Sequence, residues 1–177
     1  GVTDGTESLQ ELVDAIAAQG GPRYAYAEVA PENNKDGGKP GTNIRNAFLY
    51  DPARVHLHDS VHGPGNFNQH AHVISDSNGV HLSHNPARIH PERECFDGSR
   101  KPLVAEFVDQ VSGESIFCAN AHLISKRTNP RERAIIRAEQ AQTIADYMNA
   151  LEDTLHANGL DANTIIAGDC NAMPHER

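Results

Sequence analysis

The segment Thr164-Ile-Ile-Ala-Gly-Asp-Cys-Asn-Ala172 joins a run of apolar residues to a short polar turn. The apolar half is typical of a buried β-strand, and this strand leads directly into Asp169. Gly168 allows the backbone to turn or to approach a ligand closely. Since α/β folds commonly place their sites at the ends of strands, Asp169 is a candidate site residue.

Asn171 stands two residues after Asp169, and in an extended segment two such side chains point to the same side. The carboxylate could hold a hard cation or orient a water molecule. The amide could donate to a phosphate oxygen while its own oxygen faces metal or water. The structural alternative is an Asx turn that caps the strand.

A long helix is predicted immediately before this strand, from about Pro130 to His156. Thr128 or Asn129 would cap it, and Asn158-Gly159 would end it. Apolar residues at steps of three and four predict a face that packs on the core: Ala141, Ile144, Met148, Leu151 and Leu155.

Strands and one further helix are predicted along the rest of the chain. Residues 103–108 and 115–123 form a hairpin through Ser112-Gly113. Residues 43–50 and 55–61 are predicted as an antiparallel pair. The remaining elements are a helix over 8–18, a strand over 24–29, a loop over 31–42, and short strands with long surface loops over 62–100. One mixed α/β domain, or part of one, accounts for this order.

Two more patterns carry candidate site residues. Asn120 and His122 alternate at the end of a strand, where a histidine could donate a hydrogen bond or proton to a phosphoryl oxygen, although a structural role is the alternative. Asn43 and Arg45 alternate at the start of another strand, and Arg100 precedes a third. The planar fork of arginine binds two phosphate oxygens at once, although a solvated strand start is the alternative.

Composition limits the choice of function. The chain has 177 residues and a formal net charge of -9, which argues against simple electrostatic capture of nucleic acid but not against a nucleic-acid enzyme. No apolar stretch is long enough to span a bilayer, so no membrane partner is expected. Localisation cannot be read from the ends of the chain. Three widely spaced cysteines do not form a disulfide framework, and Cys118 and Cys170 are predicted to be buried.

Histidines are concentrated in an insert over about 56–98. Eight of the eleven lie between positions 56 and 90: His56, His58, His62, His70, His72, His81, His84 and His90. The spacing of His56 with His58, and of His70 with His72, could place two imidazoles on one face and so hold a transition metal. The alternative is a solvated insert whose charge rises below about pH 6.5.

Taken together, the motifs resemble the endonuclease/exonuclease/phosphatase superfamily, in its extracellular-nuclease-like branch. The matching segments span nearly the whole chain: Asn43-Ile-Arg-Asn-Ala-Phe-Leu-Tyr-Asp-Pro-Ala-Arg-Val55, Asn85-Pro-Ala-Arg-Ile-His-Pro91, Ser99-Arg-Lys-Pro-Leu103, Asn120-Ala-His-Leu-Ile-Ser-Lys126 and Gly168-Asp-Cys-Asn-Ala172. Cys170 stands where the family usually has Phe. The resemblance implies an α+β fold, a four-layer α/β/β/α sandwich of two mixed β-sheets.

The resemblance also implies a function, a divalent-metal-dependent phosphodiesterase, foremost a nuclease acting on DNA or RNA. His122 would contact the scissile phosphate, Asp169 would orient water or bind Mg²⁺ (or Mn²⁺ or Ca²⁺), and Asn171 would hold the phosphate or a metal-bound water. Asn43 and Arg45 lie near the family position of an acidic residue, and this sequence has no carboxylate there. Asn120 and Arg100 are further phosphate-binding candidates.

Two parts of the family pattern are missing from residues 1–177. The strand with the metal-binding Glu would precede Gly1, because Leu9-Gln10-Glu11 is predicted to be helical. The closing Asp and His would follow Arg177. We therefore expect this domain fragment to be weak or inactive alone, and to associate with itself through exposed sheet edges. The alternatives are a phospholipid or inositol-phosphate phosphodiesterase of the same superfamily, or a non-catalytic binding module.

Overall fold

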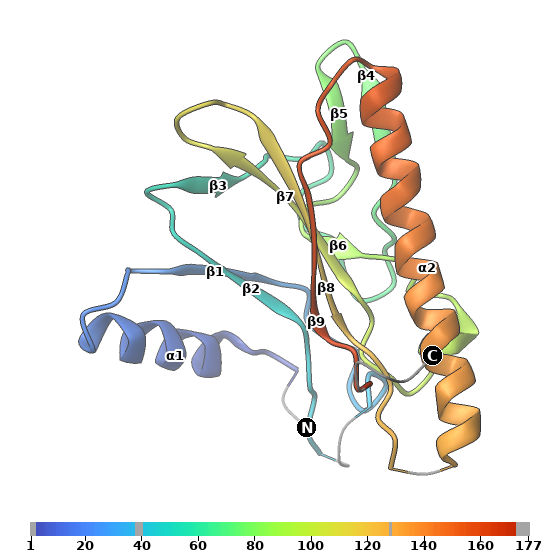
Figure 1. The fold of residues 1–177 in the computed structure, drawn as a ribbon. Helices are drawn as coiled ribbons and strands as arrows, with labels where there is room; N and C mark the ends of the chain where they lie inside the picture. The colour runs from blue at the N-terminus through green and yellow to red at the C-terminus, as the bar shows by residue number, and fades with distance from the viewer. Residues whose placement is uncertain (1–2, 38–40, 128, 173–177) are drawn as a thin grey trace.

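The computed structural model describes residues 3–37, 41–127 and 129–172, and they form a mixed α/β fold with three β-sheets (Figure 1). An α+β class therefore agrees with the structure. The helical elements are α1 (Thr6–Ala18), η1 (Glu94–Phe96) and α2 (Pro130–Ala157). The strands are β1 (Ala25–Glu28), β2 (Ala47–Tyr50), β3 (Val55–Leu57), β4 (Val73–Asp76), β5 (Gly79–Leu82), β6 (Ala87–Arg88), β7 (Leu103–Asp109), β8 (Ser115–His122) and β9 (Thr164–Asp169).

The largest sheet has five strands in the order β3-β7-β8-β9, with β6 also paired to β7. Strands β7 and β8 form the predicted antiparallel hairpin, and Gly113 takes a positive φ of 76° in its turn. Strands β8 and β9 are parallel and are connected through α2. Such a connection brings the carboxyl ends of β8 and β9 together at one edge of the sheet.

Helix α2 covers one face of this sheet (Figure 1). The strand β8 alternates between buried and half-buried residues, and its buried side chains are Phe117, Ala119 and Ala121. They share one core with the predicted helix face, of which only Ala141 is exposed. The helix begins at Pro130 after Asn129, whose side chain makes no capping bond to the backbone, and ends at Ala157, with Asn158 as its C-cap.

The pair of strands β1 and β2 lies against the opposite face of the large sheet. Asn120 donates from Nδ2 to the carbonyl of Ala47 at 2.9 Å. The rings of Phe48 and Tyr50 lie 5.6 and 5.2 Å from the ring of Phe107. Beyond this pair lies α1, which contains the Leu9-Gln10-Glu11 segment, as predicted (Figure 1).

The predicted pairing of residues 43–50 with 55–61 is wrong. Strand β2 begins only at Ala47 and pairs with β1, whereas β3 pairs with β7. The reason lies in the turn after Tyr50: Asp51 accepts bonds from Ala53 and Arg54, which winds the chain into a helical turn and directs it away from β2. Tight hairpins favour Asn-Gly or Asp-Gly instead.

The insert is not the solvated loop region that its polar composition indicated. Seven of its apolar residues are buried in the core under α2, although Val61 is exposed: Ala71, Val80, Leu82, Ala87, Ile89, Cys95 and Phe96. Single apolar residues in very short strands give no periodic signal, so their burial was not apparent from the sequence.

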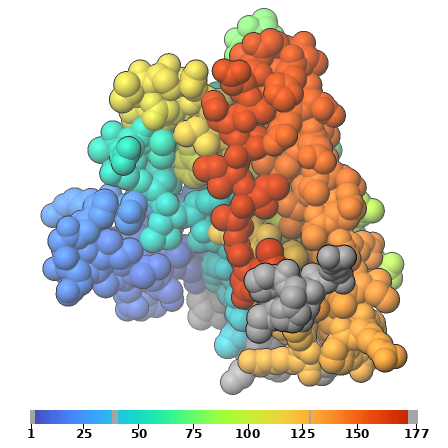
Figure 2. Space-filling model, viewed as in Figure 1, coloured from blue at the N-terminus to red at the C-terminus, as the bar shows by residue number. Residues whose placement is uncertain are grey.

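Strand β9 is exposed, contrary to the prediction of a buried strand. It is the last strand of the sheet order, and 53% of Ile165 and 55% of Ile166 remain accessible. Figure 2 shows this segment, in red, at the surface beside α2. Cys170 is likewise exposed and Cys118 only partly buried, and all three cysteines are free. Among the described residues, no helix has the length and apolar character needed to cross a membrane.

Candidate active site at the ends of strands β8 and β9

The final residues of β8 and β9 are direct neighbours, so the sheet itself places two candidate side chains together. His122 is the register partner of Asp169, and its Nε2 lies 3.7 Å from Oδ2 of the carboxylate. Both side chains are accessible, at 29% for His122 and 62% for Asp169. An imidazole and a carboxylate therefore face solvent side by side at the carboxyl end of the sheet.

Gly168 is required for this close approach. Its φ is 145°, and a Cβ atom at this position would lie 1.8 Å from the carbonyl oxygen of Ala121 on β8. Side chains cannot be accommodated at that distance, and the backbone angle is itself unfavourable for L-residues. The glycine of the Gly-Asp pair is thus explained by the packing of β9 on β8.

Asn171 reaches the site through a turn rather than by extension of the strand. Its N–H donates to Oδ1 of Asp169 at 2.8 Å, which makes the Asx turn that the sequence allowed as an alternative. Its φ is 47°, and its Nδ2 donates to the carbonyl of Leu123 at 2.8 Å. The idea that Asp169 and Asn171 share one side of an extended segment is wrong, although the turn still brings them together.

Arg100 approaches the same point from the loop before β7. It is only 8% exposed, and its Nη2 donates to the Leu123 carbonyl at 2.7 Å. Its Nε atom is buried and makes no hydrogen bond. Burial lowers the pKa of Arg100, and the negative charge of Asp169 opposes this shift.

The electrostatic environment favours a neutral imidazole at His122. Burial lowers its pKa, the positive charge of Arg100 lowers it further, and Asp169 acts in the opposite direction. A neutral imidazole has one N–H to donate and one nitrogen to accept. His122 can therefore serve either as a hydrogen-bond donor or as a proton acceptor near neutral pH.

The other three predicted residues have structural partners of their own. Arg45 pairs with Glu28 at 2.8 Å, and Asn43 bonds to the neighbouring loop at Asn33 and Asn34. Asn120 shares a face with His122, as predicted, but its amide joins β8 to β2. None of these described contacts reaches His122 or Asp169, although Arg45 and Arg100 both line a cavity of about 10 Å³.

A buried ion cluster lies beside that cavity, and sequence reasoning missed it. Asp36 is 3% exposed and binds Arg88 at 2.6 Å and Lys101 at 3.2 Å. The aspartate belongs to the polar loop after β1, where nothing in the sequence separates a buried carboxylate from a solvated one.

The sequence indicated only part of a second group, which contains two histidines and a glutamate. His58, His81 and Glu106 are the one set of three metal-type side chains that converge within the described residues. The strand spacing of His56 with His58 indicated a metal site, but the partners of His58 are more distant in the sequence. The signal that could have found them is the single carboxylate inside the apolar strand 103–108.

The residues of the candidate active site fit a Mg²⁺ ion in the chemistry of their donors. Mg²⁺ prefers oxygen ligands and is commonly held by one or two carboxylates together with water. Asp169 supplies an accessible carboxylate, and Asn171 supplies an amide whose nitrogen is already bonded to Leu123. The amide oxygen is then the atom that would face an ion.

The chain matches no protein-family model, and no curated protein matches it either.

Proposed function

We propose that this chain is part of a divalent-metal-dependent phosphodiesterase that hydrolyses DNA or RNA. The observation that carries the proposal is the 3.7 Å approach of His122 to Asp169 at the ends of adjacent parallel strands, with Arg100 and Asn171 anchored beside them. A buried cation beside an accessible acid and imidazole suits phosphoryl chemistry, which depends on positioning and on stabilisation of negative charge.

Each side chain has a role in this proposal. The neutral imidazole of His122 donates to a phosphoryl oxygen, and the carboxylate of Asp169 aligns the attacking water. The buried charge of Arg100 favours an anion at this point, since it lies where few water molecules screen it. Asn171 fixes the turn through its bond to Leu123 and orients Asp169 through its N–H.

A Mg²⁺ ion held by Asp169 and Asn171 would neutralise the charge that develops on the phosphate oxygens. The fold that we propose around this site is the four-layer α/β/β/α sandwich, incomplete in residues 1–177. The order of α2, the large sheet, the β1–β2 pair and α1 supports it (Figure 1).

The test compares purified chain with a longer version that carries sequence from both sides, on plasmid DNA, RNA and sphingomyelin, with Mg²⁺ or EDTA. We expect Mg²⁺-dependent cleavage of nucleic acid that is far faster in the longer version. His122→Ala and Asp169→Asn should each reduce the rate about 10²–10⁴-fold. His156→Ala, at an exposed position near the end of α2, is the matched control and should leave the rate unchanged.

Other outcomes would replace the proposal. Preferential hydrolysis of sphingomyelin would indicate the phospholipid branch. A longer version that cleaves none of the three substrates in the presence of Mg²⁺, Mn²⁺ or Ca²⁺ would indicate a non-catalytic binding module.

A further inference from the structure

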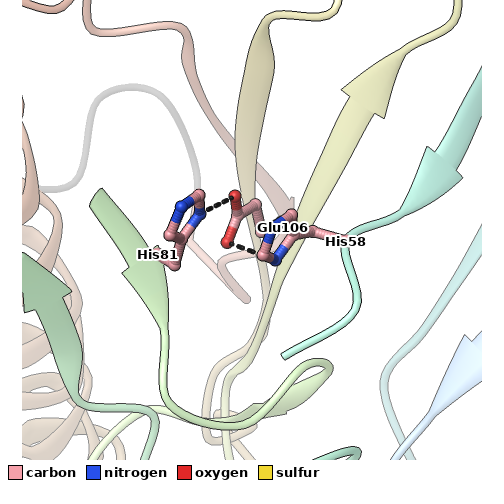
Figure 3. A group of neighbouring side chains, drawn as sticks. All are labelled: His58, His81 and Glu106. Atoms are coloured by element: carbon pink, nitrogen blue, oxygen red, sulfur yellow. Dashed lines mark hydrogen bonds and ion pairs between the residues drawn. The ribbon is translucent and has the colours of Figure 1, made fainter. Parts of the chain in front are cut away.

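Glu106 is a completely buried carboxylate in the middle of β7. Its side chain is 0% exposed, and it accepts bonds from the N–H of Leu82 at 3.1 Å and the hydroxyl of Ser115 at 2.8 Å. Two imidazoles lie against it, one on each oxygen (Figure 3). Burial of a charged carboxylate is costly unless a positive partner is present.

His81, on β5, faces an oxygen with each of its ring nitrogens. Nδ1 lies 2.9 Å from Oε1 of Glu106, and Nε2 lies 2.9 Å from the carbonyl oxygen of Asn78. A neutral imidazole has a single N–H. If that hydrogen is donated to Asn78, the lone pair of Nδ1 faces the carboxylate, and a cation is needed between them.

His58, directly after β3, lies beside the other oxygen of the Glu106 carboxylate. Its Nδ1 is buried, makes no hydrogen bond and lies 3.5 Å from Oε2 of Glu106. Its backbone is fixed on both sides, because its N–H donates to the Glu106 carbonyl and its own carbonyl accepts from Asn85. The imidazole is therefore held beside the carboxylate by a rigid backbone.

We propose that His58, His81 and Glu106 form a binding site for a first-row transition-metal ion, Zn²⁺ foremost. One donor atom from each residue lies within 4.8 Å of the other two. Two imidazole nitrogens and one carboxylate are a donor set that Zn²⁺ accepts, with water in the remaining position. The bond from His81 to the Asn78 carbonyl is the outer contact that metal-binding histidines commonly make.

Binding requires one of the two rings to turn out of its stack on the other. The two imidazoles are stacked, with centroids 4.2 Å apart and planes inclined by 3°, whereas a bound ion lies in the plane of each imidazole. His58 is the more accessible of the two rings, with 26% of its side chain exposed against 22% for His81, so it is the ring that would turn. The ion would then join β3, β5 and β7, and so attach the insert to the large sheet.

The competing explanation is a proton in place of the ion. Burial alone would lower the pKa of His81, but its bonds to Glu106 and to the Asn78 carbonyl outweigh burial and raise it. An imidazolium at His81 would satisfy both of its oxygen neighbours without metal. This explanation predicts that the protein binds no zinc at the cluster.

The test is titration of metal-free protein with Zn²⁺, followed by calorimetry and thermal unfolding. A hundredfold excess of Zn²⁺ over its Kd should raise Tm by about 5–10 °C. At the same Zn²⁺ concentration, His58→Gln should weaken binding at least tenfold and so reduce the Tm shift to about half or less. Circular dichroism would verify its fold. His56→Gln is the matched control, because His56 is an exposed neighbour on β3 outside the group.

Two further measurements locate the ion. Asp169→Asn should retain full Zn²⁺ binding, which separates this site from the proposed active site. Co²⁺ should give visible absorption bands in the wild type that are lost in His58→Gln. Absence of Zn²⁺ binding, or equal binding by wild type and His58→Gln, would overturn the proposal, as would loss of binding in Asp169→Asn.

Discussion

Arg100 and Asn171 donate to the same acceptor, the carbonyl oxygen of Leu123, at 2.7 and 2.8 Å. The two donors come from segments that are 71 positions apart by their numbering (171 − 100), and Leu123 is 6% exposed. In return, the N–H of Leu123 donates to the carbonyl of Asp169 at 2.9 Å. The backbone of one residue, Leu123, therefore bonds to the segments that carry the cation, the amide and the acid of the candidate site.

A shared acceptor predicts that the two donors are energetically coupled. Removing either one leaves the Leu123 carbonyl with the other, whereas removing both leaves a buried acceptor without these partners. Urea unfolding would compare Arg100→Met, Asn171→Gly and the double variant. The double variant should lose about 1 kcal/mol more unfolding free energy than the sum of the losses in the two single variants. Asn171→Gly keeps the positive φ of Asn171 accessible.

The control for this cycle pairs Asn171→Gly with His156→Asn, at an exposed site on α2, and should be additive. Additivity within about 0.3 kcal/mol for the Arg100 and Asn171 pair would show that the common carbonyl does not couple them.

Gly168→Ala should destabilise the protein by about 3–5 kcal/mol, because the new methyl group would meet the Ala121 carbonyl and the backbone angle would be strained. The free energy of unfolding in urea measures this loss. Gly159→Ala provides the comparison, since Gly159 has a φ of 72° with open space around it and should cost about 1 kcal/mol. Equal losses in the two variants would contradict the steric explanation.

Stability should fall as pH falls from about 6.5 to 4 because of His70. Its pKa is lowered to about 4, mainly by burial and also by His90 and His72, against the opposing effect of Glu92. Its Nδ1 also accepts a bond from the N–H of His90, and its ring edge contacts Tyr147. The unfolded chain binds the proton more readily in this pH window, so protons favour unfolding.

The contribution of His70 should be on the order of 1–2 kcal/mol once its partial exposure is taken into account. His70→Asn keeps an acceptor near Nδ1 but does not titrate, so the difference in unfolding free energy between pH 7 and pH 4.5 should shrink by this amount. His56→Asn, at an exposed position, should leave the difference unchanged. An unchanged difference in His70→Asn would exclude His70 as the source.

The exposed strand β9 should promote self-association. Ile165 and Ile166 present apolar side chains from a strand at the edge of the sheet, and unpaired edges readily add another strand. Sedimentation velocity should show concentration-dependent oligomers, reduced in the double variant Ile165→Lys, Ile166→Lys. Val111→Lys is the control, because Val111 is 95% exposed but lies in the β7–β8 turn. A monomer at all concentrations would refute this prediction.

The sequence correctly predicted the elements in which apolar residues repeat at regular spacing over many positions. The helix over 130–156 and the hairpin of 103–108 with 115–123 are confirmed nearly to the residue. Both owe this to repeated apolar spacing, which depends on local geometry alone. The parallel pairing of β8 with β9 then brings His122 to Asp169, so the meeting of these two side chains follows from the same elements.

The remaining features depended on contacts between distant segments. Strand pairing of 43–50 was mispredicted because hydrogen bonds within the turn at Asp51 decide the direction of the chain. The exposure of Ile165 could not be read from an apolar run that is equally typical of a central strand. Likewise, Glu106 and His81 are 25 positions apart, and no periodicity connects them.

The cluster of Asp36 with Arg88 and Lys101 has a practical consequence for anyone who wishes to shorten this protein. Residues 31–37 resemble expendable surface sequence, rich in polar residues and without regular structure. Yet they contribute the only described carboxylate bonded to these two cations, which lie far along the chain. Deleting the segment would leave the buried charges of Arg88 and Lys101 without this carboxylate. A trimmed variant should therefore fail to accumulate as folded protein.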